Sequence, residues 1–192
     1  MRWALVIVAT CVLAAGCGDE GSKPAAAAQK APVATTPAPA AAGPCRPATV
    51  HPPPYPGHGK GLDRLPWIAG RPRSTGLVGL VWFFSPESNP TGRARIWAGG
   101  RAPDGSNTKM LWVFLGDAAA AGADDELRVV GRRMDGPGRF ADSFAAIGYE
   151  GSDGAPSYAS IIDIPRPGCW RLTLTSGSLR ATVDMRAIPA PD

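Results

Sequence analysis

Two stretches near the C-terminus alternate between apolar and polar side chains, and this pattern constrains the fold more than any other feature of the chain. Apolar residues occupy every second position of residues 170–175, and again of residues 179–186. A period of two places alternate side chains on opposite faces of a β-strand. Between the stretches, Ser176–Gly177 can supply the positive φ of a two-residue hairpin turn. We therefore predict a hairpin with one buried face and one solvated face.

Short apolar runs separated by Gly, Pro, Asn and Asp clusters predict further strands upstream. The expected strands are residues 76–84, 93–98, 109–115, 127–132, 139–147 and 158–164. A tight reversal is expected at residues 135–138, and a connecting loop at 151–156. The composition agrees, because 24 Gly and 21 Pro among 192 residues are poorly suited to helix interiors.

One segment, residues 117–126, competes with this pattern as a helix. It contains Gly122 and has no apolar periodicity, so we interpret it as a loop. About seven or eight short strands with turns at these intervals favour an all-β fold, an antiparallel β-sandwich.

The N-terminus has the layout of an export signal. Arg2 precedes an apolar stretch, and the 14 residues from Trp3 to Gly16 are too few to span a bilayer as a helix. Leu13-Ala14-Ala15-Gly16-Cys17 resembles the lipobox of bacterial lipoproteins. This resemblance implies that residues 1–16 are a signal peptide and that the thiol of Cys17 carries a diacylglycerol. The alternative is an ordinary secretory signal that is cleaved nearby, with Cys17 incidental.

The lipobox resemblance also implies where the protein is found. An acylated Cys17 would insert into the lipid bilayer and hold the chain on the extracytoplasmic side of the cell membrane or envelope. Residues 17–44 are then a disordered linker, because the 21 residues from Pro24 to Pro44 include ten Ala and five Pro. Such a segment cannot bury enough apolar surface to offset its ordering entropy. An Ala-rich helix at residues 25–31 is too short to be stable alone. The folded domain is expected at residues 45–192.

The segment Ile164-Pro165-Arg166-Pro167-Gly168-Cys169-Trp170-Arg171-Leu172 resembles the penultimate strand of immunoglobulin-like domains in uncharacterised bacterial secreted lipoproteins. In those domains a Pro-Gly turn leads into an aromatic residue, an alternating strand and a final hairpin strand. The resemblance covers residues 164–188, implies an immunoglobulin-like β-sandwich, and carries no catalytic residue. The immunoglobulin pattern of two cysteines around a buried Trp is not matched, since only one cysteine lies in the strand region.

The cysteine count predicts a disulfide. Removing Cys11 with the signal and Cys17 by lipidation leaves Cys45 and Cys169, and an even remainder in an exported protein favours a bridge. It would join the start of the domain to a strand near its end. Because alternation places Cys169 opposite Trp170, we expect a bridge at the surface. Two unpaired thiols are the alternative.

Residues suited to catalysis or metal binding are few. The only histidines, His51 and His58, flank a Pro-rich stretch at a spacing that does not match a zinc-ligand pair. There is no Gly-x-Ser-x-Gly motif for a hydrolase. The acidic run 124–126, with Asp117 nearby, lacks the spacing of a calcium loop and is interpreted as a solvated turn. A pair of carboxylates that cleaves glycosides, drawn from Glu87, Glu126, Glu150 or any Asp, stays an open alternative, because the sequence does not show which side chains lie close in space. We expect no cofactor and no metal.

Charge points to acidic partners rather than to nucleic acid. From Cys45 onward the chain has 17 basic and 14 acidic residues, so its net charge of about +3 is a mild solubility feature. One basic cluster comprises Lys60, Arg64, Arg71 and Arg73, with Asp63 within it. An exported, tethered protein has little access to nucleic acid, so acidic wall polymer or anionic lipid is the expected partner, if this cluster has one.

Tryptophans are the remaining candidates for ligand contact. Trp82, Trp112 and Trp170 lie in apolar or inward-facing stretches, so we expect them in the core. We do not assign Trp67 and Trp97 to the core, so they are our candidates for ligand-facing aromatics, for example as a platform on which a carbohydrate stacks.

The sequence therefore predicts a monomeric, membrane-anchored lipoprotein whose β-sandwich is a non-enzymatic binding or structural module. Its partners would be the bilayer, and cell-wall polymer or another envelope protein. The alternatives are a protein that binds or processes cell-wall carbohydrate, and a metal-handling lipoprotein.

Overall fold

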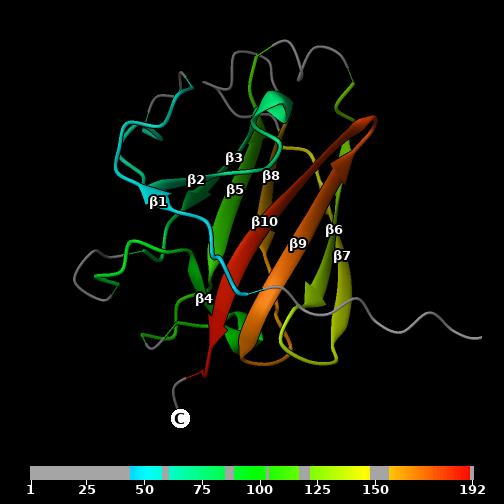
Figure 1. Cartoon of the computed structure of the whole chain (residues 1–192). Coiled ribbons are helices and arrows are strands. Elements are labelled where there is room, and N and C mark those ends of the chain that lie inside the picture. The colour runs from blue at the N-terminus through cyan, green and yellow to red at the C-terminus, as the bar shows by residue number, and fades with distance from the viewer. Residues whose placement is uncertain are drawn as a thin grey trace, which may run out of the picture. The chain divides into compact units, whose positions relative to one another are not determined.

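The computed structural model describes residues 44–57, 61–84, 89–102, 104–116, 122–147 and 156–190 (Figure 1). All of them belong to one compact unit, Pro39–Asp192. Several predictions lie outside the described residues: the signal peptide 1–16, Cys17, the linker up to residue 43, His58, Lys60, Glu87, Asp117 and Glu150. None of the described segments forms an apolar helix long enough to cross a membrane.

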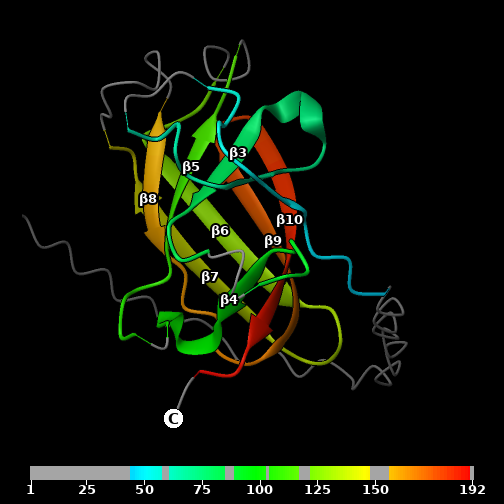
Figure 2. The same ribbon diagram turned by 90° about the vertical axis from the view of Figure 1, so that its left-hand side faces the viewer.

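The described residues form ten strands in two five-stranded sheets (Figures 1 and 2). The first sheet has the order β1 (Val50–His51), β2 (Trp67–Ala69), β3 (Leu77–Val81), β5 (Lys109–Phe114) and β8 (Ser157–Ile161). The second has the order β4 (Arg95–Trp97), β10 (Leu179–Ile188), β9 (Gly168–Ser176), β6 (Glu126–Arg133) and β7 (Arg139–Ala145). All neighbouring strands are antiparallel except β4 and β10, which are parallel.

The main core lies between the two sheets, which Figure 2 shows as two layers. The first sheet contributes Trp112, Phe114 and Tyr158, and the second contributes Trp170 and the leucines that follow it. The indole N–H of Trp112 donates to the hydroxyl of Ser160 at 2.9 Å, so this buried donor is satisfied. A second, smaller cluster on the first sheet contains Tyr55, Leu62, Val78, Leu80, Leu111 and Val113. The all-β prediction is confirmed.

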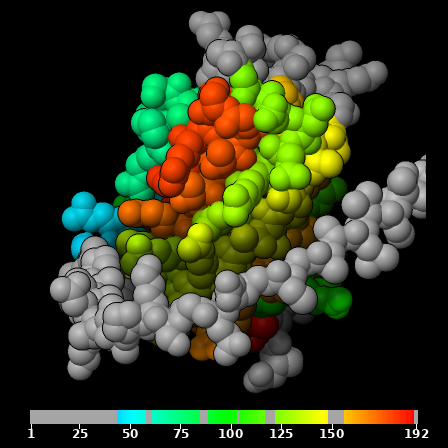
Figure 3. Space-filling view, turned by 90° about the vertical axis from the view of Figure 1, so that its right-hand side faces the viewer, coloured from blue at the N-terminus to red at the C-terminus, as the bar shows by residue number. Residues whose placement is uncertain are grey.

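The predicted C-terminal hairpin is confirmed. Its turn lies one residue later than the predicted Ser176–Gly177: Ser176 of β9 pairs with Leu179 of β10, the two turn residues are Gly177 and Ser178, and Gly177 has φ 53°. The reversal at residues 135–138 joins β6 to β7 as predicted. β6, β9 and β10 lie side by side in the second sheet (Figure 3).

Several predicted strand limits are wrong, and two strands were missed. The strand expected at 76–84 ends at Val81, and the one expected at 158–164 ends at Ile161. β1 and β2 have only two and three residues, too few to produce a periodic signal. Within 117–126, the described residues 122–125 form no helix, and Glu126 begins β6.

Cys45 and Cys169 form the predicted disulfide, with a Cα–Cα distance of 5.7 Å across 124 residues of sequence. The prediction that this bridge lies at the surface is wrong for Cys169, which is 1% exposed. Cys169 lies next to Trp170 in β9, and the loop after β6 is hydrogen-bonded to its backbone. Its backbone N–H donates to Asp135, and its carbonyl accepts from Met134.

Candidate functional site: an arginine-lined pocket

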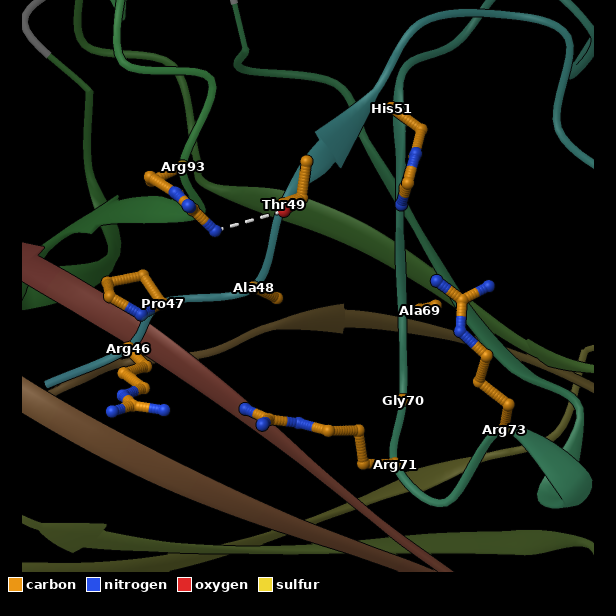
Figure 4. A pocket seen from close by; sticks show the side chains of 10 residues that line it. All are labelled: Arg46, Pro47, Ala48, Thr49, His51, Ala69, Gly70, Arg71, Arg73 and Arg93. Carbon is orange, nitrogen blue, oxygen red and sulfur yellow. Dashed lines mark hydrogen bonds between the residues drawn. The ribbon is translucent and has the colours of Figure 1, made fainter. Parts of the chain in front are cut away.

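A cavity of about 300 Å³ lies where the start of the domain meets β2 and the segment before β4 (Figure 4). Four arginines line it: Arg46, Arg71, Arg73 and Arg93. Its other walls include Thr49, His51 and the backbone around Gly70. No acidic side chain is among the described residues that line it. We refer to this cavity as the arginine pocket.

Arg46 and Arg93 are positioned by the segment that follows the disulfide. Cys45 is bonded to β9, and the N–H of Ala48 donates to the carbonyl of Asp184 at 2.8 Å. The carbonyl of Ala48 accepts from Ala94 at 2.7 Å, and Thr49 forms a bridge with Arg93. These backbone bonds hold residues 46–49 between β10 and the chain that leads into β4.

Arg71 and Arg73 come from the turn between β2 and β3. Arg71 exchanges backbone hydrogen bonds with Thr182 of β10, at 2.9 and 2.8 Å. The 3-10 helix η1 (Arg73–Thr75) follows and ends at Gly76, whose φ of 66° is left-handed. The N–H of Gly76 donates to the carbonyl of Arg73 at 3.0 Å. Glycine adopts this conformation without steric cost, so the turn that holds Arg73 depends on it.

The positive charge of the pocket is only partly neutralised. The carboxylate of Asp184, whose side chain is 6% exposed, accepts from Arg71 at 3.1 Å and from Arg171 at 2.7 and 2.9 Å. The hydrogen bond to Asp184 raises the pKa of Arg171, outweighing the opposing effect of burial. One carboxylate therefore serves two guanidinium groups.

The other pocket arginines have no carboxylate partner within the described part of the chain. Arg93 donates to the hydroxyl of Thr49 at 3.0 Å. For Arg46 and Arg73, no side-chain hydrogen bond or ion pair connects them to any described residue. Several N–H donors and an excess of positive charge thus surround one hollow. Planar guanidinium groups match carboxylate and phosphate oxygens, so the arrangement is suited to binding an anion.

The basic cluster predicted from sequence is only half correct. Arg71 and Arg73 do share a site, but their companions are Arg46 and Arg93. Arg64 lines a different cavity, and Lys60 lies outside the described residues. Arg46 and Arg93 were missed because pairing of Thr49 with Arg93 brings distant segments together. Only the position of Arg46 next to Cys45 could have indicated it.

The two candidate aromatics are not brought together. Trp67 lies on β2, where its ring stacks on His51 with centroids 4.2 Å apart and its N–H donates to the carbonyl of Pro52. Trp97 lies on β4 of the other sheet, with Phe83 edge-on at 6.1 Å. A carbohydrate platform that uses both side chains is therefore not formed.

Trp82 was predicted to be in the core, and this is wrong. Its side chain is 41% exposed, because the fully buried strand β3 ends at Val81 and Trp82 lies beyond it. The ammonium of Lys109 lies 5.7 Å from the centroid of its ring. Trp112 and Trp170 are fully buried, as predicted.

The acidic run has a structural role at the start of β6. The hydroxyl of Ser176 accepts from the N–H of Asp124 at 2.8 Å, and Tyr158 donates to the carbonyl of Asp124. Burial raises the pKa of Tyr158. Glu126 accepts from Ser143 at 2.9 Å. Within the described ranges, no group of three or more His, Cys, Asp or Glu could hold a metal ion.

One pair of carboxylates does interact across the domain. Asp142 on β7 is half-buried, and this burial, together with the negative charge of Asp163 after β8, raises the pKa of Asp142. Asp142 lies on the outer strand of the second sheet, and Asp163 follows the outer strand of the first sheet, where β7 and β8 approach each other.

In comparisons with known proteins, no family model, no curated protein and no solved structure matches the chain.

Proposed function

We propose that this chain is a membrane-anchored extracytoplasmic lipoprotein whose domain is a non-enzymatic binding module for anionic groups. Its ligand site is the arginine pocket. The observation that carries the proposal is the presence of four arginines around one cavity, with no acidic side chain in the described part of its lining. The carboxylate of Asp184 can neutralise one positive charge, and it is shared between Arg71 of the pocket and Arg171, which does not line the pocket.

Location and anchoring rest mainly on the N-terminal sequence. The lipobox resemblance at Leu13–Cys17 supports a diacylated Cys17. The disulfide agrees with an oxidising compartment outside the cytoplasm. Two packed, largely antiparallel sheets with a C-terminal hairpin support an immunoglobulin-like sandwich.

The expected ligand is an acidic polymer of the cell envelope, which presents carboxylate or phosphate groups to a tethered domain. All four arginines are exposed residues, so such a group can reach them from solvent. Binding through exposed charges falls with salt, because counterions screen them.

The proposal is tested with the full chain and purified cell-wall material. Arg46→Ala/Arg73→Ala removes the two guanidinium groups that lack a partner among described residues. It should reduce retention at least about tenfold, since a hydrogen bond to a charged group contributes roughly 1.5–3 kcal/mol. Arg128→Ala/Arg139→Ala removes two exposed arginines of β6 and β7 and is the matched control. Equal retention of the two double variants would contradict the proposal.

The same material separates binding from catalysis. Release of glycan fragments by the wild-type chain, lost on exchange of one Asp or Glu, would support the alternative of a cell-wall hydrolase. The anchor has its own test, because Cys17→Ser should yield a chain without the mass of the diacylglycerol. An unchanged mass and membrane fraction would refute lipidation at Cys17.

A further inference from the structure

A second cavity, of about 460 Å³, has largely apolar walls. These walls include the side chains of Val50, Pro52, Pro53, Pro66, Phe84 and Pro90. We refer to it as the proline cavity. Its volume falls within the range of roughly 300–1,000 Å³ that is typical of small-molecule sites.

Proline residues and hydrogen bonds within the protein hold the walls of the proline cavity in place. Proline fixes its own φ and offers no backbone N–H, so the four prolines make this part of the wall stiff without adding donors; Arg64 and Asn89 contribute polar side chains to the lining. The side-chain amide of Asn89 donates to the carbonyl of Arg93 at 2.6 Å, and the N–H of Val50 donates to Gly92 at 2.8 Å. Trp67 donates to the carbonyl of Pro52 at 3.2 Å. A cavity held in this way loses little entropy when it is filled.

The proline cavity adjoins the arginine pocket along β1. His51 lines both cavities, and Figure 4 shows its ring at the edge of the arginine pocket. The ring is held by stacking on Trp67, with an interplanar angle of 22°. The strand residue before it, Val50, faces the proline cavity, and Thr49 lines the arginine pocket. An apolar hollow and a cationic hollow therefore share one wall.

The number of donors in the arginine pocket favours a phosphate over a carboxylate. A carboxylate has two oxygens, whereas a phosphate monoester has three terminal oxygens and a charge of about −1.5 to −2 at neutral pH. Four guanidinium groups, of which Arg46 and Arg73 lack a partner among the described residues, suit the larger charge.

We propose that the two cavities bind one amphiphile, a phosphate carried on a hydrocarbon chain. The phosphate occupies the arginine pocket, and the chain passes His51 into the proline cavity. This inference rests on the proposed function, because it takes the arginine pocket as the anion site and adds the apolar part of the ligand.

The test uses the full chain in nanodiscs of neutral phosphatidylcholine, with calorimetric titration of hexyl phosphate, methyl phosphate and hexanol against empty nanodiscs as the blank. Hexyl phosphate should bind at least about 30-fold more tightly than methyl phosphate, since each buried methylene increases affinity roughly fourfold. Hexanol should bind far more weakly than hexyl phosphate, because it lacks the charge.

Two sets of variants separate the cavities. Arg46→Ala/Arg73→Ala should weaken the binding of both phosphates. Pro52→Gln/Pro90→Gln places polar groups at two exposed wall positions and should reduce the preference for hexyl over methyl phosphate to about threefold or less. Pro137→Gln/Pro165→Gln changes two exposed prolines outside both cavities and should keep the wild-type preference.

The outcomes distinguish this inference from the function on which it rests. Equal affinities of methyl and hexyl phosphate would overturn the amphiphile and leave the anion site standing. Hexanol binding as tightly as hexyl phosphate would also overturn it, since the arginines would then add nothing. If neither phosphate binds, the proposed function fails as well.

Discussion

Asp184 accepts two hydrogen bonds from the guanidinium group of Arg171, at 2.7 and 2.9 Å. Arg171 does not line the arginine pocket, so the negative charge of Asp184 is neutralised by a residue outside the pocket. The third bond, from Arg71 at 3.1 Å, is therefore not needed to neutralise Asp184. The guanidinium group of Arg71 can therefore bind an anionic ligand while Asp184 keeps its ion pair with Arg171.

Exchange of Asp184 should have opposite effects on stability and on binding. Asp184→Asn removes charged hydrogen bonds to two arginines that are half exposed, so the free energy of unfolding should fall by about 1–3 kcal/mol. The affinity for phosphate should rise, because Arg71 loses its competing anion. Denaturant titration and calorimetry measure the two effects. Asp63→Asn, at an exposed site, is the control, and weaker phosphate binding by Asp184→Asn would contradict this account.

The disulfide should support both the fold and the site. A bridge across 124 residues contributes roughly 4–5 kcal/mol in the chain-entropy model. Cys45→Ser/Cys169→Ser should lower the free energy of unfolding by about that amount, and it should weaken phosphate binding because Arg46 directly follows the lost anchor. The double variant is compared with the wild type in denaturant and in calorimetry. Undiminished phosphate affinity in the folded variant would show that the bridge does not position Arg46.

Two glycines with similar backbone angles allow a matched comparison. Gly76 has φ +66°, and a Cβ placed on it would clash with the carbonyl oxygen of Leu115. Gly92 has φ +60° with nothing within 4 Å of such a Cβ. Gly92→Ala should cost about 1–2 kcal/mol for its left-handed conformation. Gly76→Ala should cost clearly more, because backbone must also move, and equal losses in thermal unfolding would contradict the clash.

The carboxyl of Asp142 should make stability depend on pH. Burial and the charge of Asp163 raise its pKa in the folded protein, so the folded state binds this proton more tightly than the unfolded chain does. This contribution to stability is fully present below the ordinary aspartate pKa of about 4 and is lost as the pH rises through the raised value. Asp142→Asn should therefore gain stability relative to wild type as the pH increases. Parallel pH profiles of the two proteins, measured by denaturant unfolding, would refute this.

Local patterns in the sequence were sufficient for the strands that alternate, and they failed where distant segments meet. The hairpin of β9 and β10 could be predicted because Leu172, Leu174 and Val183 recur at a period of two. β1 is too short to show a period, yet its His51 lines both cavities. Asp184 occupies a polar position of β10 and is nevertheless buried, because Arg71 and Arg171 approach it from other segments.

The arginine pocket illustrates the same limit. Arg71 and Arg73 are close in sequence, so a basic cluster could be recognised there. Arg46 and Arg93 join them only through the disulfide and the bridge between Thr49 and Arg93. Such long-range pairing leaves no spacing signal in one sequence, and so the site could not be assembled before the fold.

Calorimetric titration of inorganic phosphate into the full chain tests the anion site most directly. The wild type and Arg128→Ala/Arg139→Ala should show the same saturable binding at one site, weakened by added salt. Arg46→Ala/Arg73→Ala should bind at least about tenfold more weakly. Equal affinity of the two double variants, or no saturable binding by the wild type, would contradict the central claim that the arginine pocket is an anion site.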